Sequence, residues 1–464
     1  MTATDAIFQE GDPFWHIAAG DWIRENAQIP LRDIWSFTAG DTRWLNHSWA
    51  WDVLFSWIHA QGNWHAVIAI NAIIYSATLV VVFAHCKARA GSVLAALITV
   101  FLMTTLTQIN LRPLQITMLA VAAFAWILGH AARGNATSRW LLALPMMMWV
   151  WANMHGGFIV GLLLIGAYAA FACQRREWPL LRSLVVVGMA SVFVTLCNPY
   201  GMYIYEAVWR PFSGVDSQLV AEWQPLTLTP IALLTVSYAL LFIVMIPRRV
   251  MPEILPIERA LAYGFLLLAV TAQRHLAIFA ILAAPILTCY IRSITQDLEQ
   301  TALMLRLRTS WQALATKPVA AGMMIATLAV AIWLPTHSAS RVLGDKFAIT
   351  DLSEEIDFIR SDYPKARILN SFDLGGLVIY QGRGAVKLFV DSRTTTAYPK
   401  EVMEDVLRFY RGEPGWDDIV SRYRIDGIWL LNEKEKPIID RLSQRKGWRQ
   451  VLATKETTLF MRTP

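Results

Sequence analysis

Charged residues are scarce in this chain: they make up 16% of its 464 residues, whereas soluble domains carry about 25%. Hydrophobic residues account for 55% of the sequence, and 20 residues are tryptophan. This scarcity of charge excludes an ordinary soluble protein and predicts an integral membrane protein with a sizeable polar part.

Cysteine is also rare, and its spacing excludes the usual redox and metal pairs. None of the four cysteines belongs to a C-x-x-C pair, and we interpret all of them as small core residues of apolar segments. The net charge of +6 does not predict nucleic-acid binding, because the basic residues fall in short loops between apolar runs. We expect no signal peptide, since the N-terminus lacks both a cationic n-region and an apolar h-region.

Long apolar runs are what the chain has in abundance, and runs of about 17 to 25 residues are candidate membrane helices. We predict an α-helical polytopic membrane protein with about ten transmembrane helices. The predicted spans are 64–86, 91–109, 114–131, 139–153, 156–173, 180–197, 228–246, 257–273, 275–292 and 318–335. Two neighbouring pairs, 139–153 with 156–173 and 257–273 with 275–292, are each either two helices or one re-entrant element. Residues 49–61 predict a shorter interfacial helix.

Lysine and arginine are distributed unevenly between the two sides of these spans. Over residues 49–317 one side carries only Arg112, Arg210 and Arg274, and the positive-inside rule assigns the other, basic side to the cytoplasm. The opening segment and the C-terminal third then lie outside the membrane. This topology also predicts a further helix upstream of Met1.

The apolar spans stop near residue 336, where a second type of pattern begins. Short β-like runs occur at 366–370, 385–391, 427–431, 448–453 and 457–462, and they alternate with helical patterns at 351–362, 399–412 and 435–447. This alternation predicts a small α/β domain. The predicted domains are a 1–63 outer loop with its interfacial helix, a 64–335 transmembrane helical domain, and a 336–464 extracytoplasmic α/β domain.

The opening segment places acids and histidines among large aromatic residues. They are Glu10, Asp12, His16, Asp21, Asp33, Asp41, His47 and Asp52. Glu10 and Asp12 share one side of an extended segment, so they can hold a divalent cation such as Mg²⁺ or Mn²⁺, or one acid can act as a general base. The alternatives are solvated acids of an interfacial loop, a helix cap at Asp33, and interfacial histidines at His16 and His47, which lack metal-ligand spacing.

Four polar clusters interrupt the apolar spans, and the predicted topology puts all of them at outer helix ends. They are Asn110 with Arg112 and Gln115; Asn153 with His155; Asn198–Gly201 with Glu222; and Gln273, Arg274 and His275. Polar groups in a bilayer are costly and often mark function, so we predict one outward-facing cavity. Asn-Pro-Tyr-Gly is also a simple helix stop, and His-Gly-Gly a close-packing device. Arg112 and Arg274 either bind an anion such as phosphate or snorkel to the interface.

These motifs resemble the GT-C superfamily of membrane glycosyltransferases, in particular a large group of bacterial members. The opening run from Asp12 to His47 resembles the first outer loop of that group. Further motifs of this chain are similar to later blocks of the same group: Arg112–Pro113, Asn153–Met–His155–Gly–Gly, Asn198–Pro–Tyr–Gly201, Glu222–Trp223 and Arg274–His275. Val390–Asp391–Ser–Arg393 and Gly415–Trp416 resemble the soluble domain of that group. Two positions depart from the pattern that we expect: Ser48 stands where an acid would follow the histidine, and Ser392 where glycine would stand.

The resemblance implies sugar transfer from a polyprenyl-phosphate donor to a glycan or protein acceptor at the outer face of a bacterial inner membrane. It implies Asp12 as the base, Glu10 as a second member, and Arg112 or Arg274 as a donor-phosphate contact. The candidate substrate contacts are His16, His47, Arg112, Asn153, His155, Glu222, Arg274 and His275. The expected partners are the lipid-linked donor, membrane lipid and the acceptor, with no nucleic acid.

Two other function classes stay open at this point. The chain could be a non-catalytic scaffold or assembly factor for an envelope polysaccharide or exported polymer, with the soluble domain binding the partner. A transporter ranks last, because the middles of the predicted spans hold almost no ionisable residue.

Overall fold

The computed structural model describes residues 11–40, 42–107, 110–134, 139–225, 254–299, 351–413 and 415–463. The chain forms two compact units. We call the first the loop-and-sheet unit; it contains Met1–Val67, Asn198–Ala221 and His337–Pro464. The second, the helical unit, contains Ile68–Cys197 and Glu222–Thr336. The predicted domain boundaries at residues 63 and 335 stay a prediction.

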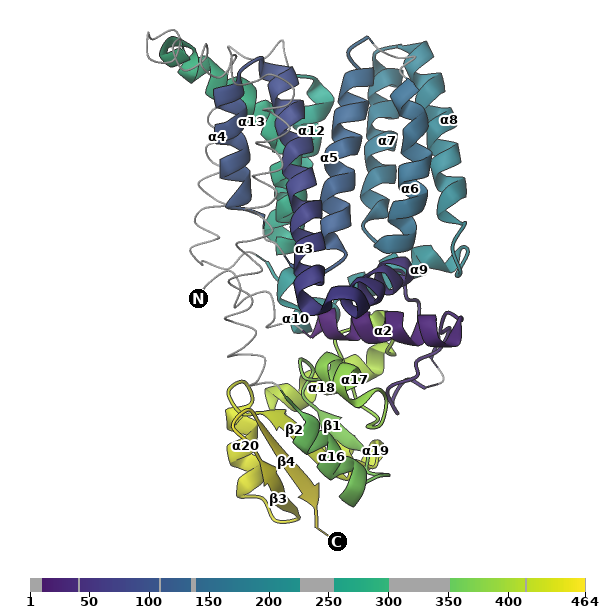
Figure 1. Cartoon of the computed structure of the whole chain (residues 1–464), viewed down its shortest axis with the longest axis vertical. Helices are drawn as coiled ribbons and strands as arrows, with labels where there is room; N and C mark the ends of the chain where they lie inside the picture. Colours follow the sequence, from purple (N-terminus) through teal and green to yellow (C-terminus); the bar gives the residue numbers. More distant parts are fainter. Residues whose placement is uncertain are drawn as a thin grey trace. The chain divides into compact units, whose positions relative to one another are not determined.

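Long apolar helices dominate the helical unit (Figure 1). Among the described residues, four helices are long and apolar enough to cross a membrane: Trp49–Ala90 (α3), Leu114–Ala131 (α5), Trp178–Thr195 (α8) and Gln273–Ser293. Two shorter apolar helices are Val93–Thr104 (α4) and Phe158–Gln174 (α7). The predicted spans 228–246 and 318–335 lie outside the described residues, so the number of about ten spans stays a prediction.

Each of the two ambiguous helix pairs forms two separate helices. Helix α6 covers Ala143–Met154, and α7 begins at Phe158. In the second pair, Pro256–Thr271 (α12) is followed by Leu276–Glu299 (α13). The predicted interfacial helix 49–61 is the first arm of α3, which is kinked where Gly62 and Asn63 leave helical geometry. Asn63 has φ 53°, a left-handed conformation that asparagine tolerates better than most residues.

One buried glutamate ties three helices of the helical unit together. Glu258 at the start of α12 accepts hydrogen bonds from Arg89 of α3, at 3.2 Å, and from Arg133, which follows α5. Gly129 of α5 lies against both ends of this contact, since a Cβ there would lie 3.1 Å from Arg133 and 3.3 Å from Glu258. Pairing of this kind is needed to keep a carboxylate in an apolar surrounding.

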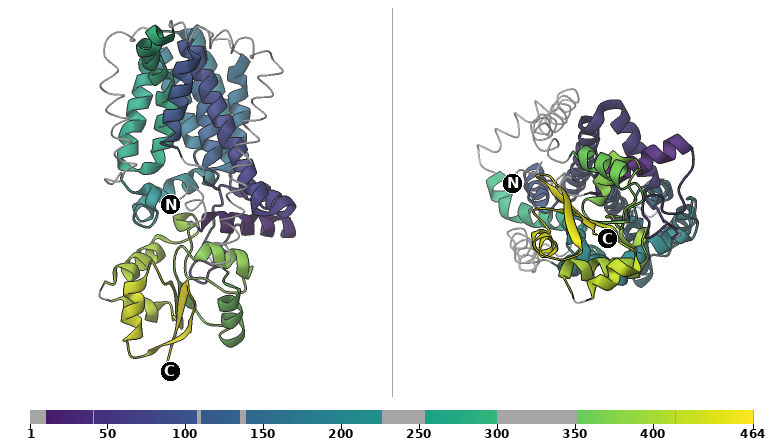
Figure 2. Two further views of the ribbon diagram at one scale, coloured as in Figure 1. Left: turned by 60° about the vertical axis from the view of Figure 1, so that its left-hand side comes forward. Right: turned by 90° about the horizontal axis from the view of Figure 1, so that it is seen from below.

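The loop-and-sheet unit contains a mixed four-stranded sheet, flanked by helices of the same unit (Figure 2). Its strands are Ile368–Asn370 (β1), Gly427–Leu431 (β2), Trp448–Ala453 (β3) and Thr457–Arg462 (β4). Their order is β1-β2-β4-β3, with β1 and β2 parallel and the other pairs antiparallel. The α-helices of this unit, whether or not they lie beside the sheet, are Asp12–Asn26 (α2), Tyr203–Trp209 (α9), Asp216–Leu219 (α10), Ser353–Asp362 (α16), Gly375–Gly382 (α17), Lys400–Arg411 (α18), Trp416–Arg422 (α19) and Lys436–Ser443 (α20).

The opening loop is joined to this sheet by backbone hydrogen bonds. Phe37 donates its N–H to the carbonyl of Leu388 at 3.0 Å, and Leu388 donates to the carbonyl of Trp35 at 3.0 Å. Residues 385–391, which we expected to form a strand, instead make isolated bridges from Leu388 to Ser36 and to Ile368. The first loop therefore continues the edge of the C-terminal sheet.

Candidate functional site

The predicted site residues fall in both units of the chain. Asp12, His16 and His47 belong to the loop-and-sheet unit, and Glu10 lies outside the described residues. The helical unit holds the others: Arg112, Asn153, His155, Glu222, Arg274 and His275.

Asp12 is the first residue of α2, where Pro13 is compatible with the first helical turn. An acid in the first turn is favoured by the helix dipole, and the indole Nε1 of Trp15 donates to Oδ1 of Asp12 at 3.1 Å. Asp12 is half-buried. It therefore has a defined position and keeps part of its surface open to another molecule.

The residue before Asp12 packs closely against the C-terminal part of the unit. A Cβ on Gly11 would lie 2.8 Å from the carbonyl oxygen of Asp373 and 3.6 Å from Oγ of Ser392, and a Cβ on Gly376 would lie 2.0 Å from the carbonyl oxygen of Gly11. Only glycine fits such an approach of two backbones. The start of α2 is thus seated against the start of α17 and the Asp391–Arg393 turn.

His16 and Asp52 form a buried pair. Nδ1 of His16 lies 2.6 Å from Oδ1 of Asp52, and the two residues are 3% and 0% exposed. Asn46 donates its Nδ2 to the other carboxylate oxygen at 2.7 Å, and the Ser48 hydroxyl donates to Oδ1 of Asn46 at 3.1 Å. The serine at position 48 therefore orients the amide that binds Asp52. Substrate contact by His16 or by half-buried His47 stays a prediction.

A second buried cluster joins the opening loop to the C-terminal part of the unit. Nη1 of Arg393 lies 2.6 Å from Oδ1 of Asp33, and its Nη2 lies 2.6 Å from Oδ2 of Asp391. The hydroxyl of Tyr398 donates to Asp391 at 2.6 Å, and the guanidinium lies 4.6 Å from the ring centre of Trp44. All three charged side chains are fully buried, so we assign this cluster to the architecture of the unit.

The charges of this cluster stabilise one another strongly. Burial alone would raise the pKa of Asp33, but the Arg393 guanidinium and two hydrogen bonds from Ser36 outweigh it and lower that pKa. Burial would lower the pKa of Arg393, but Asp33 and Asp391 outweigh it and raise that pKa well above its ordinary value. Asp33 is therefore ionised. It accepts the N–H and the hydroxyl of Ser36 within a loop, so it caps no helix among the described residues.

Members of three of the predicted outer clusters meet in the helical unit. Nη1 of Arg112 donates to Glu222 at 2.9 Å, and the guanidinium of Arg274 lies 3.9 Å from the ring centre of Trp223. The N–H of Gln273 donates to the carbonyl of Gln224 at 3.1 Å. Residues 222–224 thus bring both candidate phosphate-binding arginines to one short segment.

His155 is oriented by two donors in the same unit. Its Nδ1 accepts the N–H of Gly157 at 3.1 Å and lies 2.6 Å from the Thr117 hydroxyl, which itself accepts the Trp151 indole N–H at 2.8 Å. This pattern makes Nδ1 an acceptor and fits the neutral tautomer protonated at Nε2. A Cβ at Gly157 would lie 2.3 Å from Thr117, so the Gly-Gly pair is also a close-packing device.

Asn153 and His275 bind backbone carbonyls at helix ends. Nδ2 of Asn153 donates to the carbonyls of Trp149 at 2.9 Å and Cys197 at 3.3 Å, and Nδ1 of His275 lies 3.2 Å from the carbonyl of Leu268. These contacts close helix ends. A substrate contact at either residue stays a prediction.

The part of the chain that the structure describes contains no further cluster of metal-binding side chains. No group of three or more His, Cys, Asp or Glu side chains that could hold a metal ion occurs there. Because Glu10 is outside that part, the predicted cation site at Glu10 and Asp12 stays a prediction.

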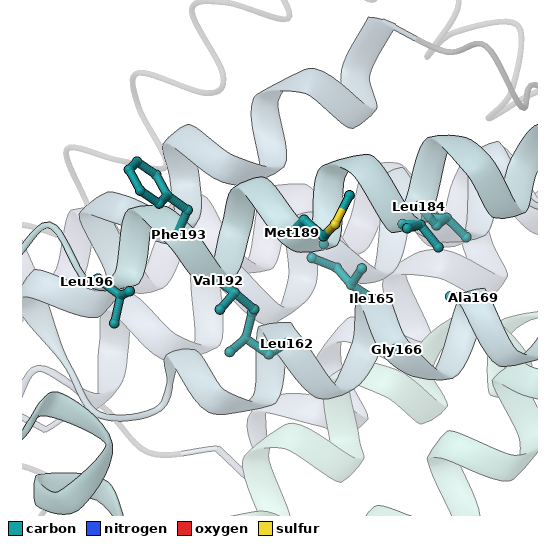
Figure 3. Close-up of a pocket in the computed structure, with 11 residues that line it drawn as sticks. Leu162, Ile165, Gly166, Ala169, Leu184, Met189, Val192, Phe193 and Leu196 are labelled. Atoms are coloured by element: carbon teal, nitrogen blue, oxygen red, sulfur yellow. The ribbon is translucent and has the colours of Figure 1, made fainter. Parts of the chain in front are cut away.

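A groove of about 560 Å³ runs between α7 and α8 of the helical unit (Figure 3). Its walls are apolar side chains such as Leu162, Met189 and Phe193, and Gly166 and Gly188 lie along it. It contains none of the predicted site residues. Lipid-facing helices commonly show such apolar surfaces, and we assign no chemistry to it.

Sequence reasoning missed the partners of several of these side chains. His16 and Asp52 are 36 residues apart and Asp33 and Arg393 are 360 apart, so no local pattern pairs them. The signal that could have found the second pair was the Asp-Ser-Arg motif itself, because an arginine between buried strands and helices needs carboxylate partners.

Comparisons with known proteins identify the fold. No protein-family model matches the chain, and no curated protein matches it in sequence. Among solved structures, the chain is similar to the apo crystal structure of the Archaeoglobus fulgidus oligosaccharyltransferase, with a TM-score of 0.53 and 11% sequence identity. The match covers 91% of this chain and 66% of that protein, so the chain spans slightly less than two thirds of its length. The chain therefore shares the fold of that solved structure over most of its length.

Proposed function

We propose that this chain is a membrane glycosyltransferase that moves a sugar from a polyprenyl-phosphate-linked donor to an acceptor at the extracytoplasmic face. The observation that carries the proposal is the GT-C-type fold over 91% of the chain, combined with a half-buried acid, Asp12, at a fixed helix start. The solved relative is itself an oligosaccharyltransferase.

The proposed reaction needs one base and one source of positive charge. Asp12 takes the proton of the acceptor hydroxyl as its oxygen forms a bond to the anomeric carbon of the sugar. The bond between that carbon and the donor phosphate oxygen breaks, and polyprenyl phosphate leaves with the bonding electrons. Attack opposite to the leaving group inverts the anomeric configuration.

Arginine is well suited to the leaving phosphate, because its planar guanidinium binds phosphate oxygens in a forked geometry. Arg274 on the face of Trp223 and Arg112 beside Glu222 are the candidates. A divalent cation at Glu10 and Asp12 would supply further positive charge in the same reaction. The sugar and the acceptor belong to classes that the proposal leaves general.

The direct test is sugar transfer to endogenous acceptors in membranes that contain Asp12→Ala. We expect a loss of about 100-fold or more, because a positioned general base contributes about 10²–10⁴-fold. Glu25→Gln is the matched control, since Glu25 is an exposed acid on the same helix. Undiminished transfer by Asp12→Ala would contradict the catalytic assignment and favour the scaffold alternative. In that alternative Asp12 is dispensable, and deletion of residues 336–464 abolishes function.

A further inference from the structure

His16 lies four residues after the proposed base on α2, and its buried partner Asp52 belongs to α3. We propose that His16 and Asp52 are positioning residues that fix the Asp12 carboxylate through the indole of Trp15. This inference rests on the proposed function, because it assigns the pair a role in the reaction that Asp12 performs. Neither residue touches a substrate in this assignment.

Trp15 links the pair to Asp12. Its ring is stacked on the imidazole of His16, with ring centres 3.7 Å apart and planes 30° apart. The same indole donates its N–H to Oδ1 of Asp12 at 3.1 Å. An imidazole of fixed orientation therefore sets the plane of the indole, and the indole N–H sets the direction of the carboxylate.

Asp52 fixes the imidazole from the first arm of α3. One carboxylate oxygen lies 2.6 Å from Nδ1 of His16, and the other accepts Nδ2 of Asn46 at 2.7 Å. Both oxygens are thus directed, so the imidazole has little freedom to rotate. Support of a reactive group by such a hydrogen-bonded partner is a common way to keep it in productive geometry.

The backbone makes the same crossing rigid. A Cβ at Gly20, one turn after His16, would lie 2.0 Å from the carbonyl oxygen of Asp52, so α2 and α3 touch through their backbones at this point. This backbone contact lies close to the His16–Asp52 pair, so a shift of Asp52 would move α2 as a whole. Displacement of α2 by about 1 Å would be enough to cost about 100-fold in rate.

Two other roles for the pair do not fit the geometry. Direct proton transfer with an acceptor would need an accessible imidazole, and His16 is 3% exposed. A role in stability alone would not require a polar pair, because well-packed apolar residues often replace buried polar partners at little or no cost. That difference provides the test.

The experiment replaces the pair by apolar residues in the full-length protein, as His16→Met with Asp52→Leu. Transfer is measured with the lipid-linked sugar extracted from host membranes, and thermal unfolding is measured on the same samples. We expect kcat to fall about 100-fold, with KM for the lipid-linked sugar unchanged and the unfolding temperature close to that of the wild type. His16→Asn, which keeps a donor for Asp52 near the Nδ1 position but has no ring for Trp15 to stack on, should leave kcat low. His65→Met is the matched control, because His65 is an exposed histidine of α3.

A second variant keeps the inference testable if the double variant does not fold. Trp15→Phe preserves an aromatic ring over His16 but removes the N–H that binds Asp12, and we expect a lower kcat with normal folding. Wild-type kcat in either folded variant overturns the inference. If Asp12→Ala is itself fully active, the proposed function fails first; if Asp12→Ala is inactive while these variants are active, only the positioning role fails.

Discussion

Asp12 and Asp33 belong to the same opening segment of the chain, and their surroundings in the structure differ. Asp33 is fully buried, bound to Arg393 at 2.6 Å and to the Ser36 hydroxyl at 2.6 Å. Asp12 is half-buried and receives an indole N–H at the start of a helix. A carboxylate that is sealed by a cation and hydrogen bonds is committed to the fold, whereas the half-buried carboxylate of Asp12 keeps part of its surface exposed.

The arginines of the chain repeat this contrast. Arg393 is fully buried between two carboxylates, while Arg274 lies half-buried on the face of Trp223. The comparison teaches that charge in a loop is not by itself a sign of a reaction site. Burial and the identity of the partner decide which acid anchors the loop and which acid is proposed to react.

We call the buried cluster of Asp33, Arg393 and Asp391 the anchor. The largest effect should come from removing its cation. Arg393→Met leaves Asp33 and Asp391 buried without their cation, and we expect the free energy of unfolding of the loop-and-sheet unit to fall by about 3–5 kcal/mol. Chemical unfolding followed by limited proteolysis of the C-terminal part measures this loss. Arg360→Met is the control, since Arg360 forms an exposed pair with Asp357 and should change little. An equally small effect of Arg393→Met would remove the distinction between anchor and reactive residues.

A smaller effect, on binding rather than on folding, is expected at the other arginine. Arg274→Gln should raise KM for the lipid-linked sugar by about 10- to 100-fold, because a hydrogen bond to a charged group contributes about 1.5–3 kcal/mol. Unfolding should be unaffected. Arg210→Gln is the control, since Arg210 binds Glu206 in the loop-and-sheet unit. Equal KM values for the Arg274 and Arg210 variants would argue against a phosphate contact at Arg274.

The buried acid Asp33 should also make the stability of the loop-and-sheet unit depend on pH. Because the folded-state pKa of Asp33 is lowered, its contribution to stability is present above the unfolded pKa, about 4, and is lost as the pH falls below that value. Unfolding measured between about pH 5 and pH 2 should show a steeper loss in the wild type than in Asp33→Asn. Identical slopes for the wild type and Asp33→Asn would contradict the lowered pKa.

The smallest effect should follow from trimming one partner of the anchor. Ser36→Ala removes the hydroxyl that binds Asp33 at 2.6 Å but leaves Arg393 in place. We expect a loss of about 1 kcal/mol in the free energy of unfolding, with sugar transfer unchanged. Loss of transfer at full stability would show that the anchor also shapes the reaction site.

The sequence predicted the parts of the fold that depend on local patterns. Apolar runs located α5, α7, α8 and α13, and the alternating pattern after residue 336 predicted a small α/β sheet domain. The short helices α17 and α19 were not predicted, because eight residues or fewer carry little periodicity. The strand expected at 385–391 became a bridged segment because its partner, residues 35–37, comes from the opening loop.

The candidate site was predictable only as a set of residue types. Acid, arginine and histidine at the ends of apolar helices could be selected by their cost in a membrane. Their partners could not, because the contact of Arg112 with Glu222 spans 110 residues and that of Thr117 with His155 spans 38. Such pairings depend on how whole helices pack, which hydrophobic periodicity leaves open.

Mass spectrometry of the lipid that co-purifies with the protein tests the central claim most directly. We predict that the wild-type protein carries a polyprenyl phosphate or its sugar-linked form, that Asp12→Ala retains it, and that Arg274→Gln loses most of it. Absence of any polyprenyl phosphate from the wild type, with the same lipid profile in the arginine variants, would contradict the account.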